Sequence, residues 1–206
     1  MIRLFQIFLI SQFFMSSLAL ASEDWGFDAL MEELAKHPQF SADFEEQRSS
    51  MFLSRPLKLH GILIFVANEK MEKRVVRPYV ETTIIDDAAV VIRRTNTIGK
   101  EDTTHVTRFS LAAHPAIAKA INGVSNIFSG DSSLLKELYD WQIEGQRDDW
   151  GLLLKPKDGK LAEFISSIEL RGHDGIITQM NSVEADGDES KMALSNRSTD
   201  IPELNQ

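Results

Sequence analysis

The segment LKLHGILIFV, residues 57–66, is apolar on both faces of the β-strand that its composition predicts. Successive side chains of a strand point to opposite faces. Leu63 and Phe65 would therefore share one face, and Ile62 and Ile64 would share the other. A strand in a single antiparallel sheet commonly has one face in water. Here both faces require cover, which restricts the chain to folds that shield a sheet on two sides.

The same pattern recurs in TTIIDDAAVVIRR, residues 82–94, where apolar residues again occupy consecutive positions. Two arrangements would satisfy it. The sheet can pack against helices and against itself, as in a sandwich. Alternatively, the sheet can curve so that its inner face lines an apolar cavity, with helices as the cover. Apolar stripes are most often ordinary core, and the pattern alone leaves both arrangements open.

Two segments have the spacing of an amphipathic helix. The first is predicted over residues 24–37, with Asp24 as its N-cap and Pro38 as its stop. The second follows Pro115 and ends near Gly130. Both would cover the inner face of the sheet. The apolar positions of the first are Phe27, Leu30, Met31 and Leu34. Those of the second are Ile117, Ile121, Val124 and Phe128.

The remaining segments alternate apolar and polar residues and are predicted as antiparallel strands. Turn signals separate them at Asp86–Asp87, at the PKDG sequence of 156–159 and at the DGD sequence of 186–188. A further short helix, DSSLLKELY, would be capped by Asp131 or Ser132. This order of elements predicts an α+β fold with one large antiparallel sheet and a few helices on one side.

The N-terminal segment MIRLFQIFLISQFFMSSLALAS has one basic residue, then an apolar run, and then Ala19-Leu20-Ala21. This is the pattern of a secretory signal peptide with an A-x-A cleavage site after Ala21. Polar residues interrupt the run, whereas a membrane-spanning helix needs roughly 20 mostly apolar residues. We therefore predict a signal peptide over residues 1–21 and a single exported domain over residues 22–206.

Composition narrows the classes of partner and of site. No cysteine is present, which excludes disulfides and thiolate metal ligands. The formal net charge is −9, and an acidic surface argues against nucleic acid and anionic membrane surfaces as partners. The histidines are scattered, with no two at i, i+4 spacing, so no metal site is predicted. No glycine-rich phosphate loop follows a strand, and no cofactor is expected.

One weak nucleophile motif is present. GDSSL, residues 130–134, resembles the nucleophile block of GDS-type lipases, with Ser132 or Ser133 as the nucleophile. That block belongs near the mature N-terminus and needs a late Asp-x-x-His, which this chain lacks. The G-x-S-x-G signature of other acyl hydrolases is also absent. Because no convincing catalytic constellation is present, binding or carriage is favoured over catalysis.

Several motifs match those of a known family in order and spacing. FSADFEEQR carries an F-x-x-x-F-x-x-Q pattern, and Pro56, the apolar GILIF segment and Arg77–Pro78 follow it. A late block carries further matches at Trp141, Leu152, Leu154, Pro156, Lys157, Ile168, Asp174, Gly175, Ile176 and Asp186. Over about residues 25–195, the sequence resembles the periplasmic outer-membrane lipoprotein carrier proteins of the LolA type, as a divergent branch.

The resemblance implies an unclosed antiparallel β-barrel whose helices cover an apolar cavity. It also implies a monomeric periplasmic carrier, not an enzyme, that binds lipid or the acyl chains of lipoproteins. Cargo would pass from an inner-membrane exporter to an outer-membrane acceptor protein. The family's C-terminal extension is reduced here to STDIPELNQ. The cargo therefore stays open between lipoprotein and free lipid, glycolipid or fatty-acyl cargo.

The site expected from the resemblance works by apolar contact. An acyl chain gains about 0.8 kcal/mol per CH₂ removed from water, which holds cargo without catalysis. The predicted cavity wall consists of Phe44, Leu63, Phe65, Val91, Trp141, Ile143, Leu154 and Ile168. The predicted lid residues are Ile117, Ile121 and Phe128. The alternative is an envelope interaction module with the same fold, in which these residues form an ordinary core.

Overall fold

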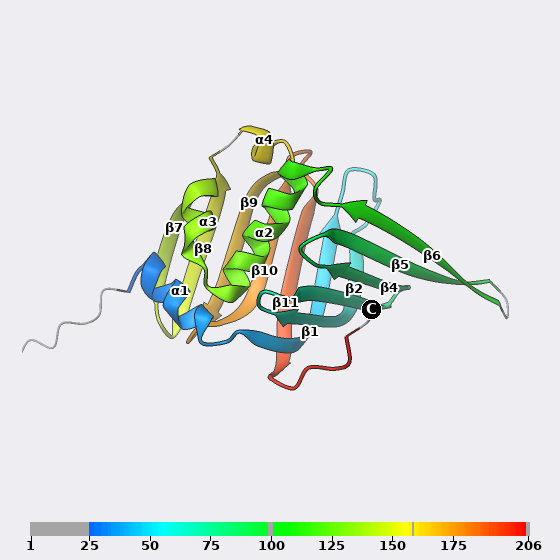
Figure 1. Ribbon diagram of the computed structural model, residues 1–206, viewed down its shortest axis with the longest axis horizontal. Helices are drawn as coiled ribbons and strands as arrows, with labels where there is room; N and C mark the ends of the chain where they lie inside the picture. Colours follow the sequence, from blue (N-terminus) through cyan, green and yellow to red (C-terminus); the bar gives the residue numbers. More distant parts are fainter. Residues whose placement is uncertain (1–24, 99–100, 158, 205–206) are drawn as a thin grey trace, which may run out of the picture.

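One strongly curved antiparallel sheet, with helices on its concave side, forms the protein (Figure 1). The structure is a computed structural model that describes residues 25–98, 101–157 and 159–204. The predicted signal peptide and Asp24, the expected helix cap, lie outside the described residues. Within those ranges, no helix is long and apolar enough to cross a membrane.

The sheet has 11 strands in the order β6-β5-β4-β3-β2-β1-β11-β10-β9-β8-β7. β6 and β7 are its two edges, so the barrel is not closed, and the predicted unclosed α+β barrel is confirmed. The strands are β1 (Gln39–Ser49), β2 (Leu57–Val66), β3 (Lys70–Arg77), β4 (Val80–Ile85), β5 (Ala89–Ile98), β6 (Glu101–Ser110), β7 (Tyr139–Gln146), β8 (Asp149–Pro156), β9 (Ile165–His173), β10 (Ile176–Glu184) and β11 (Glu189–Ser198). The helices are α1 (Phe27–Ala35), α2 (Pro115–Ser129), α3 (Ser132–Leu138) and α4 (Gly159–Ala162).

Local turn and cap chemistry operates where the sequence predicts it. Between β4 and β5, the Asp86 carboxylate accepts hydrogen bonds from two backbone N–H groups of the turn, each at 2.8 Å. α2 ends at Gly130, whose φ of 70° lies in the left-handed region that favours glycine. The Asp131 carboxylate accepts a hydrogen bond from the Ser133 N–H at 2.9 Å and so caps α3. All three predicted boundaries are confirmed.

α1 is shorter than the helix predicted over residues 24–37. It begins at Phe27, after Gly26 in an extended conformation that offers no side-chain cap, and it ends at Ala35. The predicted apolar stripe is nevertheless confirmed, because all four of its residues are buried. The stripe packs α1 against the hydrophobic core cluster.

The register assigns each strand residue to one of two faces, because residues directly opposite in an antiparallel pair share a face. Phe40 pairs with Phe65, and Phe65 pairs with Met71. These three lie on the concave face, where they contact the helix-covered core. Ser41, which follows Phe40, and Ile64, which precedes Phe65, pair with each other on the convex face.

The C-terminal segment covers the convex face of β1–β3. The Asp200 carbonyl accepts a hydrogen bond from Ser41 Oγ on β1 at 2.8 Å, and the Glu203 carbonyl accepts one from Arg74 on β3. Because β2 lies between β1 and β3, the segment crosses β2, and Figure 1 shows the red chain end running from β11 to the C-terminus on this side of the molecule. Ile64, on the convex face of β2, is fully buried. Both faces of β2 are thus covered, which accounts for its doubly apolar sequence.

Candidate functional site

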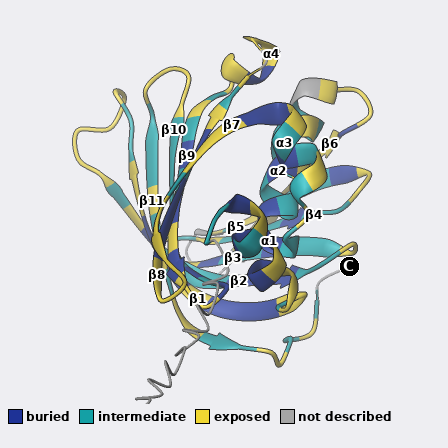
Figure 2. Cartoon of the chain, turned by 90° about the vertical axis from the view of Figure 1, so that its left-hand side faces the viewer, coloured by how far each residue is buried: buried dark blue, intermediate teal, exposed yellow. Residues whose placement is uncertain are grey.

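The concave face of the sheet is lined with apolar side chains that helices cover. Figure 2 shows α1, α2 and α3 seated within the curve of the sheet. One continuous buried cluster joins Leu30 of α1 and Leu135 of α3 to strand residues such as Phe40 and Leu152. The concave face is therefore apolar, and its own helices cover it.

Seven of the predicted cavity-wall residues lie on this concave face. Ile143 is half-buried and packs against the cluster. Trp141, on the edge strand β7, is 37% exposed, and its ring stacks on Phe27 of α1 at a centroid distance of 4.6 Å. The other five, Phe44, Leu63, Phe65, Leu154 and Ile168, are buried within the cluster. Their contact with a cargo stays a prediction.

Val91 lies on the opposite face, and its assignment to the cavity wall is wrong. It pairs with Ile84, which lies in the same cross-strand row as Ile64 on the convex side. Its neighbours Val90 and Ile92 take the concave positions instead. A run of three apolar residues does not reveal which of them point inward. The register of the β4–β5 hairpin makes that choice.

The lid helix α2 is seated most deeply at its C-terminal end. Phe128 is buried, and its ring centroid lies 5.4 Å from those of Phe40 and Phe65. Ile117 and Ile121 are only half-buried and lie outside the core cluster. The predicted stripe therefore marks the inward face correctly at Phe128 and is rotated away from it in the first half of the helix.

α2 is attached to the sheet through apolar side chains. Ile127, which is outside the predicted stripe, is fully buried, and Ala120 and Val124 pack against the core. Within the described part of the chain, the hydrogen bonds of α2 are local to the helix and its two ends. An ion pair between Lys119 and Glu137 at 4.0 Å joins α2 to α3. Among the described residues, no hydrogen bond therefore joins α2 to the central strands of the sheet.

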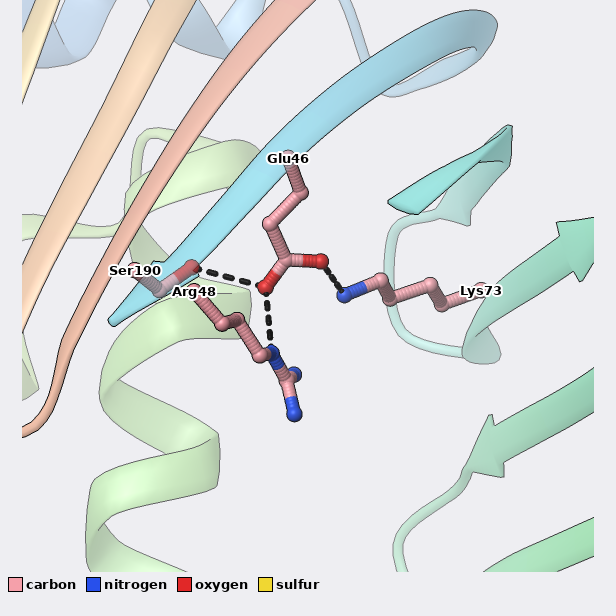
Figure 3. Close-up of polar contacts among 4 residues, drawn as sticks. All are labelled: Glu46, Arg48, Lys73 and Ser190. Atoms are coloured by element: carbon pink, nitrogen blue, oxygen red, sulfur yellow. Dashed lines mark hydrogen bonds and ion pairs between the residues drawn. The ribbon is translucent and has the colours of Figure 1, made fainter. Parts of the chain in front are cut away.

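A charged cluster interrupts the apolar lining on β1. Figure 3 shows the Glu46 carboxylate between Arg48, Lys73 and Ser190. Its Oε1 accepts hydrogen bonds from Arg48 Nε and Ser190 Oγ, each at 2.7 Å, and its Oε2 pairs with the Lys73 ammonium. The ammonium also lies 4.9 Å from the ring centroid of Phe44. The cluster links β11, β1 and β3 on the concave side.

The cations of the cluster keep the buried carboxylate ionised. Burial alone would raise the pKa of Glu46, but Lys73 and Arg48 outweigh it and hold that pKa below its ordinary value of 4.5. Burial also lowers the pKa of Lys73, and Glu46 opposes that change. The sequence carries one signal for this cluster. Glu46 and Arg48 continue the inward phase of Phe40 and Phe44, where a charged residue requires a partner.

The candidate nucleophiles lie at the start of α3. The Ser133 hydroxyl donates to the Asp131 carboxylate at 2.6 Å, and the same carboxylate caps the helix. Both interactions hold the pKa of Asp131 below its ordinary value. Among the residues that the structure describes, no group of three or more His, Cys, Asp or Glu side chains could hold a metal ion.

A family model described as outer membrane lipoprotein carrier protein LolA-like matches residues 19–206. No curated protein matches the sequence.

Solved structures resemble the chain at low sequence identity. A chain of the Pseudomonas aeruginosa MucA/MucB complex is 13% identical with a TM-score of 0.45, and the match covers 86% of this chain but 58% of that one. A LolA superfamily protein from Nitrosomonas europaea is 11% identical with a TM-score of 0.42, covering 86% and 96% of the two chains. LprF from Mycobacterium bovis is 10% identical with a TM-score of 0.41, covering 87% and 96%.

Proposed function

Because this chain belongs to the outer membrane lipoprotein carrier protein LolA-like family, we propose that it is a periplasmic carrier of acylated cargo. The concave face would bind the acyl chains of a lipid or lipoprotein. The protein would carry this cargo from an inner-membrane exporter to an outer-membrane acceptor protein. The signal-peptide pattern of residues 1–21 supports export. The observation that carries the proposal is the attachment of α2 to an apolar concave face through side chains.

Cargo and α2 would compete for the same surface. Seating α2 buries Ile127 and Phe128, which is worth about 1.5–3 kcal/mol for each side chain. A long acyl chain gains on the order of 10 kcal/mol when it leaves water, at about 0.8 kcal/mol per CH₂. The acyl chain therefore outweighs the two lid residues. Without cargo, the lid keeps the apolar face out of water, where it would promote aggregation.

Native mass spectrometry of the protein purified from the periplasm tests this proposal. We expect a lipid or an acylated protein to co-purify, and a fluorescent fatty acid to bind the purified chain. Binding of cargo should also increase the rate of amide hydrogen exchange in α2, because the helix is displaced from the concave face. The carrier function is wrong if no lipid co-purifies and the fluorescent fatty acid does not bind.

Adjacent residues on opposite faces of β2 provide a matched pair of variants. Leu63 is buried on the concave face, and Ile62 is half-buried on the convex face. Leu63→Asp should abolish fatty-acid binding, whereas Ile62→Asp should leave it within about twofold of the wild type. Equal losses in two folded variants would show that β2 lines an ordinary core. Circular dichroism of both variants confirms that they are folded.

Catalysis is not expected of this chain. Members of the family are generally non-enzymatic binding proteins. The two serines of the GDSSL motif lie at a helix start, where Ser133 is engaged with the capping carboxylate. Replacing Ser132 and Ser133 together by alanine should therefore leave lipid binding unchanged. An esterase activity lost in this double variant would favour the hydrolase alternative.

A second candidate function, an envelope interaction module, is favoured by one exposed loop. Met51, Phe52 and Leu53, between β1 and β2, are 79%, 86% and 42% exposed. Contiguous exposed apolar residues mark interaction sites, whereas isolated ones are normal. Phe52→Ser should then abolish cross-linking to an envelope protein and leave lipid binding intact. Val106→Ser, at an isolated exposed position, is the control. Unchanged cross-linking in Phe52→Ser would show that this loop is not part of the interface with the envelope protein.

A further inference from the structure

β11 contains one extra residue where it pairs with the start of β1. Ser41 pairs with Ser198, and Asp43 pairs with Ser195, so three steps on β11 match two on β1. Asn196 lies in this bulge with a φ of 49°, which is uncommon for a residue other than glycine. Its amide donates to the Asp43 carboxylate at 2.8 Å and holds the bulge in place. A β-bulge of this kind redirects the side chains that follow it.

The bulge places Arg197 on the concave side of the sheet. Ser198 shares the convex face with Ser41, so the residue before it faces inward. The Arg197 guanidinium lies over the ring of Phe40 at 4.1 Å from the centroid. Without the extra residue, Asn196 would take this inward position. A strained backbone position therefore presents a cation to the apolar face of a carrier fold.

Arg197 has no charged partner among the residues that the structure describes. No hydrogen bond or ion pair joins its guanidinium to another described residue, and the guanidinium instead makes a cation–π contact with the ring of Phe40. Burial lowers the pKa of Arg197, and no carboxylate opposes that change. A partly buried cation normally has a carboxylate partner that offsets its desolvation. The ring offsets part of that cost, and an anion within reach of the guanidinium would offset more of it.

A cavity of about 240 Å³ opens beside this guanidinium. It lies where the sheet divides, because β10 and β11 pair only between 179–183 and 189–193. Apolar side chains form much of its wall, among them Phe40, Ala42, Ile177 and Leu194. The first three also belong to the concave core. The cavity is smaller than the roughly 300–1,000 Å³ of pockets for drug-sized ligands. It therefore suits a head group and the first carbons of a chain.

We propose that Arg197 and this cavity bind the oxyanion head group of an amphiphilic cargo, a carboxylate or a phosphate, whose acyl chain continues onto the concave face. The planar guanidinium can hold either oxyanion through two parallel hydrogen bonds. The Phe40 ring then stacks against the guanidinium, and the apolar wall of the cavity contacts the first carbons of the acyl chain. This inference rests on the proposed carrier function and names the chemical class of its cargo.

Isothermal titration calorimetry with chain-matched ligands tests the head-group site. The ligands are oleate, oleoyl lysophosphatidate and oleyl alcohol, each below its aggregation concentration. We expect the wild-type protein to bind at least one of the two anions roughly tenfold or more tightly than the alcohol, and the tighter anion identifies the head group. Arg197→Gln should bring anion and alcohol to equal affinity while the alcohol binds as before.

Two further variants test whether the preference for the anion depends on this cavity. Arg171→Gln is the control, because Arg171 pairs with Glu144 and Glu169 outside this cavity, and it should keep the preference for the anion. Ile176→Glu leaves Arg197 in place and adds a carboxylate to the same cavity, so it should also abolish the preference. This variant decides the question if Arg197→Gln does not fold.

The outcomes separate the two proposals. Equal affinity of the wild-type protein for anions and alcohol overturns the head-group site and leaves the carrier function standing. The same holds if both Arg197→Gln and Ile176→Glu keep the preference. A wild-type protein that binds none of the three ligands overturns both proposals. The unfolding temperature gives an independent readout. Arg197→Gln should leave it unchanged or raise it, whereas a purely structural Arg197 would make it fall.

Discussion

The Lys73 ammonium on β3 forms an ion pair with the Glu46 carboxylate on β1, across the intervening strand β2. Glu46 is 3% exposed, and the Lys73 side chain is 19% exposed. The pair therefore lies within the concave face and not at the surface. Removing one partner of such a pair leaves the other desolvated and unpaired, which costs far more than the pair itself contributes.

Glu46→Gln should lower the free energy of unfolding by about 1–3 kcal/mol at pH 7. The Arg48 and Lys73 side chains keep some access to water, which limits the loss. Urea denaturation of the two proteins measures it. Glu45→Gln is the matched control, because Glu45 is the adjacent residue and its side chain is 78% exposed. Equal stability of Glu46→Gln and the wild type would contradict the prediction.

The stability difference between the wild type and Glu46→Gln should depend on pH. The folded pKa of Glu46 lies below its ordinary value of 4.5, so the ionised carboxylate stabilises the folded state above about pH 4.5. That contribution is lost as the pH falls through the folded pKa. The difference in stability between wild type and Glu46→Gln should therefore be full at pH 7 and shrink below about pH 4. Urea titrations at pH 7 and pH 3.5 measure the change. A constant difference would show that Glu46 is not the titrating group.

Gly61→Ala should destabilise the protein by about 3 kcal/mol, because a methyl group does not fit. A Cβ at Gly61 would lie 1.8 Å from the Arg74 carbonyl oxygen and 2.8 Å from the Phe44 ring. The first of these neighbours is backbone and cannot turn aside. Gly159→Ala is the control and should be neutral or slightly stabilising, because a Cβ there would meet no heavy atom within 4 Å apart from its chain neighbours and the backbone of its own helix. Thermal unfolding of both variants separates steric exclusion from a general effect of alanine.

Tyr139→Phe should be neutral or stabilising by up to about 1 kcal/mol. The Tyr139 hydroxyl is buried and has no hydrogen-bond partner among the described residues, and burial raises its pKa. Removing the oxygen therefore removes an unsatisfied polar atom without losing an interaction. Tyr79→Phe, at a half-buried tyrosine under Arg94, is the comparison. A loss above 1 kcal/mol in Tyr139→Phe would reveal a hydrogen bond to that hydroxyl.

Deleting residues 200–206 should lower the free energy of unfolding by about 3 kcal/mol, because the convex face of β2 would open to water. Ile64 would lose its cover, and Ser41 and Arg74 would lose the carbonyl oxygens to which they donate. Denaturant titration measures the loss. A deletion of residues 205–206 alone leaves these contacts in place and serves as the control. Equal stability of both truncated chains would show that the crossing segment does not shield β2.

The sequence alone determined the elements that depend on neighbouring residues. The Asp86 turn, the Gly130 helix end and the Asp131 cap each act through hydrogen bonds or backbone angles within a few positions. Period-2 alternation on β1 likewise marks Phe40 and Phe44 as inward without knowledge of the rest of the chain. Local patterning of this kind was sufficient for the α+β class, whereas the choice of a curved sheet under helices over a sandwich came from the family resemblance.

Only the tertiary structure decided the features that depend on distant pairing. The β4–β5 register turns Val91 outward, and the packing of α2 buries Ile127 in preference to Ile121. The bulge at Asn196 directs Arg197 inward, although the strand pattern by itself assigns the inward position to Asn196. For Val91 and for Ile127, the alternatives are residues of the same or similar type, so local propensity does not choose between them. A one-residue shift in pairing reverses the faces of a strand, and that shift is fixed by partners far away in the sequence.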